Sequence, residues 1–324
     1  MNYYEVKGTD LKVSVLGYGC MNLGQRWDQS VLEDKDIERT KESVMTAFEQ
    51  GINFFDHADI YTYGKSEVAF GELLGEEPSL RQQMIIQTKC GIRFQDDPKP
   101  GSPHRYDFSA QHIVRSVNES LDRLQTDYLD VLLLHRPDPL CEPEEIALAF
   151  AELHSAGKVR YFGVSNHTAM QIELLKKSID YPIIFNQVEL NLVHNQLIYE
   201  GIHFNQNVSI PSLTHGTLDY CRLNDITVQA WSPLAKGLLT SDGMSKSEIE
   251  IETSELLEDM AVSKHSTPEA IMLSWLLRHP AGIQPIIGTT KARRILDACK
   301  AVKVQLTREE WYHLLNTVIG KNLP

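Results

Sequence analysis

Three side chains with complementary chemistry, Asp56, Lys89 and His135, each end a short apolar segment, and Tyr61 follows Asp56 by five residues. A phenol is protonated at neutral pH, with an ordinary pKa of about 10, and a nearby ammonium group makes it a better acid. An aspartate can hold that ammonium charged, and a neutral imidazole can orient a carbonyl oxygen. The set suits proton donation to a carbonyl oxygen that becomes an alkoxide when hydride attacks its carbon. A nicotinamide would be the source of that hydride.

Each of these residues, taken alone, has an ordinary structural explanation. Asp56 could cap the following helix, and Tyr61 could pack on the surface. Lys89 could be a solvated strand end, and His135 a core histidine that donates to a carbonyl. Chance does not readily place all of them at equivalent strand ends. Such ends meet at one face of an α/β barrel, where active sites of that fold lie.

Several other chemistries have no support in the sequence. There is no Gly-x-Ser-x-Gly or His-Glu-x-x-His motif, and no second carboxylate for glycoside hydrolysis stands at these ends. The run Gly17-Tyr18-Gly19 lacks the third glycine of a dinucleotide fingerprint, which argues against a Rossmann site. The last apolar strand instead leads into Gly288-Thr289-Thr290-Lys291 and then Arg294. Backbone amides, hydroxyls and cations there could hold a phosphate.

Composition narrows the class of protein. The 324 residues include 31 Lys and Arg against 44 Asp and Glu, a net charge of −13. This acidity argues against nucleic-acid and anionic-membrane partners. The five cysteines are scattered without a Cys-x-x-Cys pair, so we expect no metal framework, no disulfide scaffold and a cytoplasmic location. No signal peptide or membrane span is expected. The acidic segment 247–259 is expected to be a solvated helix face or a mobile loop.

Short, nearly all-apolar strands alternate with helical patterns along the chain, which predicts a parallel sheet covered by helices. The expected strands are 13–16, 53–56, 84–88, 129–134, 161–164, 183–187, 227–231 and 284–287. The expected helices are 34–50, 66–74, 109–124, 143–156, 169–177, 213–223, 268–278, 291–299 and 307–318. Eight such units predict a (β/α)8 TIM barrel. An N-terminal β-hairpin over 3–13 and an extra C-terminal helix complete a single domain, 1–324.

Motifs along nearly the whole chain resemble those of the aldo-keto reductase superfamily. Asp56-His57-Ala58-Asp59-Ile60-Tyr61 is similar to its D-x-A-x-x-Y motif. Gln87-Thr88-Lys89 and Leu132-Leu133-Leu134-His135 resemble its lysine and histidine strands. Gly163-Val164-Ser165-Asn166, Asn186-Gln187-Val188-Glu189, Ser232-Pro233-Leu234 and Gly288-Thr289-Thr290-Lys291 follow in the family's order.

The resemblance implies an NADPH-dependent reductase of aldehydes or ketones. Tyr61 would be the general acid, Lys89 and Asp56 would support it, and His135 would orient the carbonyl. Ser165, Asn166 and Gln187 would bind the nicotinamide carboxamide, and Trp231 would stack on the ring. Ser232, Leu234 and Gly237 would line the pyrophosphate, and Thr289 and Arg294 would meet the 2′-phosphate. The remaining expected cofactor contacts are Gly19, Cys20, Met21, Asp56, Pro233, Lys236, Gly288, Thr290 and Lys291.

The sequence departs from the family pattern at two positions. Many members have Lys-Ser where this chain has Gly288-Thr289, and an Asn near the adenine where it has Ala298. The expected substrate is a small carbonyl compound, with pocket walls from 91–108 and 195–209 and an apolar contribution from Trp27 and Trp231. A monomer is the default expectation. The alternative is a nicotinamide-binding redox sensor or regulatory subunit with little turnover, because potassium-channel β subunits also resemble this superfamily.

Overall fold

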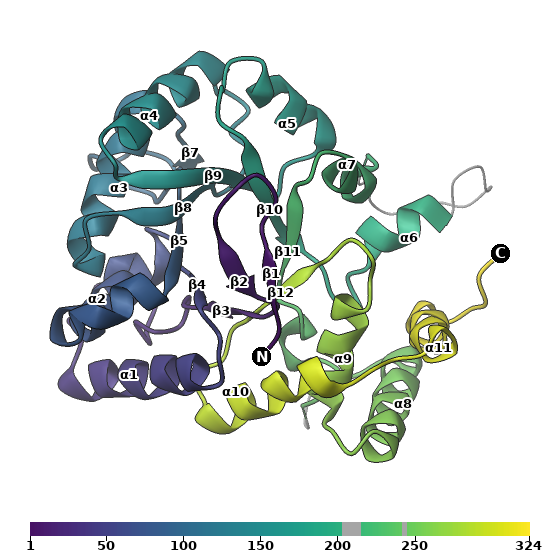
Figure 1. Cartoon of the computed structure of the whole chain (residues 1–324). Helices are drawn as coiled ribbons and strands as arrows, with labels where there is room; N and C mark the ends of the chain where they lie inside the picture. Colours follow the sequence, from purple (N-terminus) through teal and green to yellow (C-terminus); the bar gives the residue numbers. More distant parts are fainter. Residues whose placement is uncertain (203–214, 242–244) are drawn as a thin grey trace.

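Eight parallel strands close into a barrel in the computed structural model, which describes residues 1–202, 215–241 and 245–324 (Figure 1). The barrel strands are β3 (Gly17–Gly19), β4 (Phe54–Asp56), β5 (Ile85–Cys90), β8 (Leu129–Leu134), β9 (Val159–Ser165), β10 (Ile183–Glu189), β11 (Thr227–Trp231) and β12 (Gln284–Ile287). Around the barrel they follow chain order, and β12 pairs with β3 to close the ring. The predicted (β/α)8 barrel is confirmed.

Helices wrap the outside of this barrel (Figure 1). They are α1 (Asp34–Glu49), α2 (Lys65–Glu76), α3 (Ala110–Leu124), α4 (Pro143–Ser155), α5 (Ala169–Lys176), α6 (Gln196–Ile202), α7 (Thr217–Leu223), α8 (Glu248–Ser263), α9 (Pro268–Leu277), α10 (Ala292–Cys299) and α11 (Arg308–Ile319). Short 3-10 turns lie at Tyr61–Gly64, Pro78–Gln83, Ala235–Gly237 and Lys300–Lys303.

Local sequence explains where several helices begin. Ser109 is the N-cap of α3, as predicted, and its side chain accepts from the backbone N–H of His112. Ser247 and Thr307 form capping boxes at the starts of α8 and α11. The acidic segment 247–259 is therefore helical, and α8 packs against α9 and α11.

The predicted N-terminal hairpin is confirmed, but the expected barrel strand 13–16 and the expected loop 91–108 differ from the structure. The chain 13–16 is not the first barrel strand: β1 (Tyr3–Glu5) pairs antiparallel with β2 (Lys12–Ser14), and the barrel strand is the shorter Gly17–Gly19. The segment 91–108 is not all loop, because β6 (Ile92–Arg93) and β7 (Arg105–Tyr106) form a second hairpin.

Helix α6 was not predicted at all. The helix expected over 213–223 begins at Thr217 among the described residues, and 213–214 lie outside them. Of the expected pocket wall 195–209, residues 203–209 lie outside the described residues as well.

The apolar core has two layers, one between strands and helices and one inside the barrel. Val6, Leu11 and Val13 of the N-terminal hairpin pack with interior residues such as Phe54 and Phe185. Figure 1 shows this hairpin across one end of the barrel. That end is closed, so the carboxyl ends of the strands at the other end are left to form a site.

Candidate active site

The four predicted catalytic side chains meet at the carboxyl ends of the strands, around the ammonium group of Lys89. Its Nζ lies 2.7 and 2.8 Å from the two carboxylate oxygens of Asp56. It donates to the backbone carbonyl of His57 at 2.8 Å and to the Tyr61 hydroxyl at 3.0 Å. All three donors of the ammonium are thereby directed, and one of them fixes the phenol oxygen.

Backbone pairing between adjacent strands sets this geometry. The N–H of His57 donates to Gln87 O at 2.7 Å, and that of Asp59 to Lys89 O at 3.0 Å, which extends the β4–β5 pairing past the strand end. The chain then turns sharply through Thr62, which has a φ of 50°. The N–H of Tyr61 donates to Ala58 O at 3.1 Å, and the Tyr61 ring lies over Lys89, with the Nζ atom 4.9 Å from the ring centroid.

The ring of His135 lies 5.9 Å from that of Tyr61, nearly perpendicular to it. Burial, together with the positive charges of Lys89 and Arg136, holds the pKa of His135 well below its usual value of 6.5. The imidazole is therefore neutral at physiological pH, as a group that orients a carbonyl without competing for its proton needs to be.

Burial and electrostatic contacts act in opposite directions on the proton donor. Burial raises the pKa of Tyr61, Lys89 lowers it, and Asp56 raises it again, so that the net pKa is above 10. Burial lowers the pKa of Lys89, but Asp56 and Tyr61 outweigh it, and the net pKa is raised. In the free protein the phenol is thus protonated and the amine is charged, which is the state required for proton donation.

A cavity of about 500 Å³ opens above these residues. The predicted site residues that line it are Gly19, Met21, Asp56, Tyr61, His135, Ser165, Asn166, Gln187, Trp231, Ser232, Pro233, Leu234, Lys236, Gly237, Gly288, Thr289 and Arg294. Lys89 lies behind Tyr61, fully buried. Cys20, Thr290 and Lys291 do not line the cavity, and the Cys20 side chain is fully buried.

Other lining residues were not predicted as site residues. These are Asn22, Arg136, Thr240, Ser241, Glu269, Ile286, Ile287 and Ala298. Of these residues, Arg136 is the one that the sequence could have identified, because it directly follows His135 at the end of β8. Its guanidinium lies 5.7 Å from the centroid of the Trp231 ring. Within the described residues it has no carboxylate partner.

The residues predicted to hold a carboxamide are already tied to one another. Asn166 donates to Ser165 Oγ at 2.8 Å, and its side-chain oxygen accepts from the indole N–H of Trp231 at 3.1 Å. The amide N–H groups of Gln187 are directed to Asp56 Oδ1 at 3.0 Å and to Gln229 Oε1 at 3.1 Å. Gln187 therefore offers its carbonyl oxygen, as an acceptor, to anything bound in the cavity.

The far part of the cavity suits phosphate groups. The segment 232–237 contains residues with positive φ, including Lys236 at 55° and Gly237 at 84°, and turns of this kind can form a concavity of backbone N–H groups that binds anions. A Cβ on Gly237 would lie 2.7 Å from Ser241 Oγ, so glycine suits this close approach. Lys236 and Arg294 add two cations to the lining. An elongated ligand with a polar ring at one end and phosphates at the other fits this set of donors.

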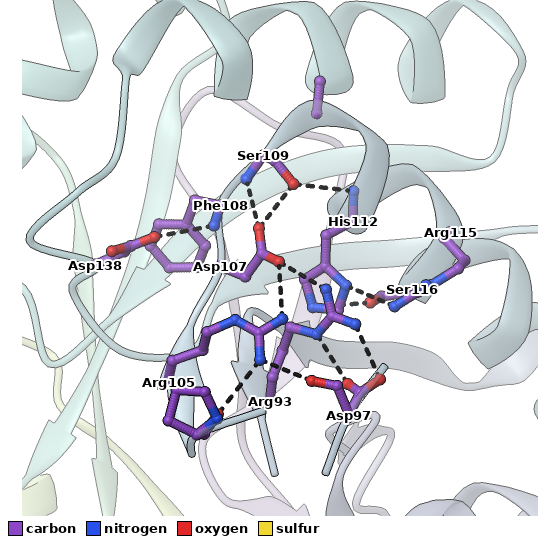
Figure 2. Close-up of polar contacts among 12 residues, drawn as sticks. Arg93, Asp97, Arg105, Asp107, Phe108, Ser109, His112, Arg115, Ser116 and Asp138 are labelled. Carbon is purple, nitrogen blue, oxygen red and sulfur yellow. Dashed lines mark hydrogen bonds and ion pairs between the residues drawn. The ribbon is translucent and has the colours of Figure 1, made fainter. Parts of the chain in front are cut away.

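The loop 91–108 contains a cluster of ion pairs around Arg93. Figure 2 shows Arg93 between Asp97 and Asp107, and the distances are 2.8 and 2.7 Å. No residue of this loop lines the described cavity, in contrast to the prediction that it forms a substrate wall. The ring of Phe94 packs 4.8 Å from that of Tyr63, two residues after Tyr61. Trp27 does reach the site, 6.5 Å from the Tyr61 ring.

Two kinds of feature are missing from the residues that the structure describes. No group of three or more histidine, cysteine, aspartate or glutamate side chains is arranged to hold a metal ion. Among the helices of residues 1–202, 215–241 and 245–324, none has the length and apolar character to cross a membrane.

Comparison with known proteins gives one consistent family. The model of the aldo/keto reductase family matches residues 15–316. The oxidoreductase YcsN of Bacillus subtilis (strain 168) is 36% identical over 316 residues, which cover 97% of each chain. A 6-dehydroglucose reductase of Novosphingobium aromaticivorans is 35% identical, over 87% of this chain and 86% of its own. The thermostable aldo-keto reductase Tm1743, solved with the inhibitor epalrestat, is 26% identical with a TM-score of 0.78, over 98% of this chain and 100% of its own.

Proposed function

The chain belongs to the aldo/keto reductase family, whose members are nicotinamide-dependent oxidoreductases, and from that premise we propose that it reduces an aldehyde or ketone to an alcohol with NADPH and with Tyr61 as the general acid. The observation that carries this proposal is the 3.0 Å contact from Lys89 Nζ to the Tyr61 hydroxyl, in a cavity wall shared with His135.

NADPH, when bound, would supply hydride to the carbonyl carbon. Tyr61 donates its hydroxyl proton to the carbonyl oxygen as negative charge develops there. Lys89 stabilises the phenolate that this leaves, and Asp56 keeps Lys89 charged and directed. The neutral imidazole of His135 orients the carbonyl oxygen beside the phenol.

The cofactor part of the proposal depends on the wall of the cavity. Ser165, Asn166 and Gln187 would hold the carboxamide, and Trp231 would lie against the ring. The loop 232–237 would hold the pyrophosphate, with Lys236 as its cation. Glu269 in the same wall opposes a second negative charge. Thr289 and Arg294 would contact the adenosine 2′-phosphate. We expect the contact with Arg294 to outweigh the effect of Glu269, so that NADPH binds more tightly than NADH.

The direct test compares the protein with its Tyr61→Phe variant. Fluorescence titration should give the same NADPH affinity for both, and turnover of 4-nitrobenzaldehyde should fall by about 100-fold or more in the variant. Arg294→Met should weaken NADPH binding and leave NADH binding unchanged. Full activity of Tyr61→Phe would refute the role of the phenol. Tight NADPH binding without turnover in the unmodified protein would favour the redox-sensor alternative.

Arg136 indicates the class of substrate. It is a cation in the wall of the cavity, next to His135, with five N–H donors suited to carboxylate or hydroxyl oxygens. A relative at 35% identity is named as a 6-dehydroglucose reductase. We therefore expect a preference for aldehydes that carry a carboxylate or several hydroxyl groups.

The test uses two aldehydes of similar shape. We expect kcat/KM for 4-carboxybenzaldehyde to exceed that for 4-nitrobenzaldehyde by about tenfold, from one charge-assisted contact. The Arg136→Met variant should lose this preference and keep its activity on 4-nitrobenzaldehyde. An unchanged preference in Arg136→Met would exclude Arg136 as the group that recognises the substrate.

A further inference from the structure

Four glutamine side chains occupy the interior of the barrel below Asp56. Gln87, Gln187, Gln229 and Gln284 come from β5, β10, β11 and β12, and each is at most 2% exposed. Barrel interiors are usually filled by bulky apolar side chains. A buried amide is costly unless its polar atoms are hydrogen-bonded, so four of them in one interior require an explanation.

Two of these amides are directed at one carboxylate oxygen. Gln87 Nε2 donates to Asp56 Oδ1 at 2.6 Å, and Gln187 Nε2 donates to the same atom at 3.0 Å. Lys89 Nζ lies 2.7 Å from that oxygen too. Three donors on one oxygen leave no place for a proton there, so Asp56 Oδ1 acts only as an acceptor.

Gln229 fixes the orientation of both amides. Its Oε1 accepts the second N–H of Gln87 at 2.9 Å and of Gln187 at 3.1 Å. If either amide turned over, its carbonyl oxygen would face both Asp56 Oδ1 and Gln229 Oε1, and like partial charges would repel at hydrogen-bond distance. Gln229 thus ensures that N–H groups face the carboxylate.

Gln284 continues the chain to the closed end of the barrel. Gln229 Nε2 donates to Gln284 Oε1 at 2.9 Å, and Gln284 Nε2 donates to the backbone carbonyl of Ser14 at 2.8 Å. Ser14 belongs to β2 of the N-terminal hairpin. The hydrogen bonds therefore run unbroken from the active site to the hairpin.

One atom of this network has no partner. Gln87 Oε1 is buried without a hydrogen-bond partner among the described residues. An unpaired buried carbonyl is destabilising, and an apolar side chain would avoid that cost. The amide is therefore useful for its two N–H groups, one of which is directed at Asp56.

We propose that Gln229 and Gln284 are positioning residues that act through Gln87 and Gln187 on Asp56, and through Asp56 and Lys89 on the proton donor Tyr61. The proposal rests on the proposed function for its catalytic meaning. The negative charge of Asp56 raises the pKa of the phenol, and amide N–H groups directed at the carboxylate balance part of that charge. Loss of these donors should make Tyr61 a weaker acid.

Few other titratable groups lie close enough to shift the pKa of Tyr61. The titratable groups that face Tyr61 are Lys89, Asp56, Cys20 and His135. Burial raises the pKa of the Cys20 thiol and lowers that of His135, so both are neutral across the range of interest. Lys89 and Asp56 are therefore the charges that the glutamine chain can influence.

The test is the pH midpoint at which oxidation of 4-nitrobenzyl alcohol by NADP reaches half of its high-pH plateau in kcat/KM, because this direction requires the phenolate. The variants are Gln87→Met, Gln229→Met and Gln284→Met, which keep the length of the side chain and remove the amide. We expect the midpoint to rise by about one pH unit in Gln87→Met, by less in Gln229→Met, and least in Gln284→Met.

The matched control is Asn186→Leu. Asn186 is a buried amide on the same strand as Gln187, and its Nδ2 donates to the backbone carbonyl of His167 at 2.9 Å, outside the chain. Its loss should lower thermal stability and leave the midpoint unchanged. A folded Gln229→Met protein with the unmodified midpoint would overturn the proposal, as would an equal shift in Asn186→Leu.

A second readout separates this inference from the proposed function. Tyrosinate absorbance, taken as the difference between each protein and its Tyr61→Phe counterpart, reports ionisation of Tyr61 without turnover. An unmodified protein that does not reduce aldehydes would defeat the proposed function, and the same absorbance shift in Gln229→Met would still support the role of the glutamines. Absence of that shift would refute it.

Discussion

Removal of the ammonium group at the centre of the site tests the electrostatic reasoning most severely. Lys89→Met keeps most of the side-chain length but leaves the buried carboxylate of Asp56 without its cation. Loss of one partner of a buried ion pair destabilises by about 3–5 kcal/mol. Gln87 and Gln187 still donate to Asp56, at 2.6 and 3.0 Å, so the low end of that range applies.

The Lys89→Met variant also loses a hydrogen bond to the backbone after β4. Lys89 Nζ also donates to the carbonyl of His57 at 2.8 Å, and loss of this bond destabilises by about 1 kcal/mol more. We therefore expect Lys89→Met to lower the free energy of unfolding by about 4 kcal/mol. Reduction should fall by about 100-fold or more, because the phenol of Tyr61 loses the charge that stabilises its conjugate base.

The assay is urea unfolding at neutral pH together with kcat/KM for 4-nitrobenzaldehyde. The decisive comparison is the double variant Lys89→Met/Asp56→Asn, which removes both charges and retains an acceptor oxygen for the two glutamines. It should be more stable than Lys89→Met by about 2 kcal/mol, although neither protein should be active. A double variant as unstable as the single one would refute the uncompensated carboxylate as the cause.

Two further predictions concern pH. Burial, and then Glu67, raise the pKa of Asp59 to about 8, so the stability that comes from its protonated form is complete below about pH 4 and is lost as the pH rises through the folded pKa. Asp59→Asn should therefore be more stable than the unmodified protein by about 5 kcal/mol near pH 8, with no difference near pH 4, in urea titrations; a constant difference would contradict this. Since the pKa of His135 lies well below 6.5 and that of Tyr61 above 10, NADPH-dependent reduction should be flat from about pH 6 to 9 and decline only as the pH rises through the pKa of the phenol. A loss of activity on the acid side near pH 6.5 that disappears in His135→Asn would show that the imidazole titrates.

Much of the fold could be predicted because the barrel strands are apolar runs that end in polar residues. That signal fails for the first strand, since Gly17–Gly19 contains a single large side chain, and the neighbouring run 13–16 has a stronger apolar pattern. Antiparallel pairing of Lys12–Ser14 with Tyr3–Glu5 takes that run into the hairpin instead. A tertiary contact thus overrides the local pattern.

The catalytic group was predictable for a geometric reason. The carboxyl ends of parallel barrel strands converge, so Asp56, Lys89 and His135 must lie near one another once the fold is correct. The same rule does not reach Glu269 or Thr240, because these residues belong to a helix start and a loop whose approach to the cavity is a property of packing. The loop 91–108 was misplaced for the same reason, since its contacts, such as the ion pairs of Arg93 with Asp97 and Asp107, are not encoded in a strand end.

The net charge of −13 has the same sign as an anionic dinucleotide, so over long distances the protein repels such a ligand. Long-range repulsion is limited, however, because charges farther apart than about 8 Å are largely screened at physiological salt. Arg136, Lys236 and Arg294 all line the cavity, and none of the three has an ion-pair partner among the described residues. Their charge acts over short distances in a partly desolvated wall, where a cation interacts more strongly with an anion than it does in water. The distribution of charge, rather than its sum, therefore decides what the site can bind.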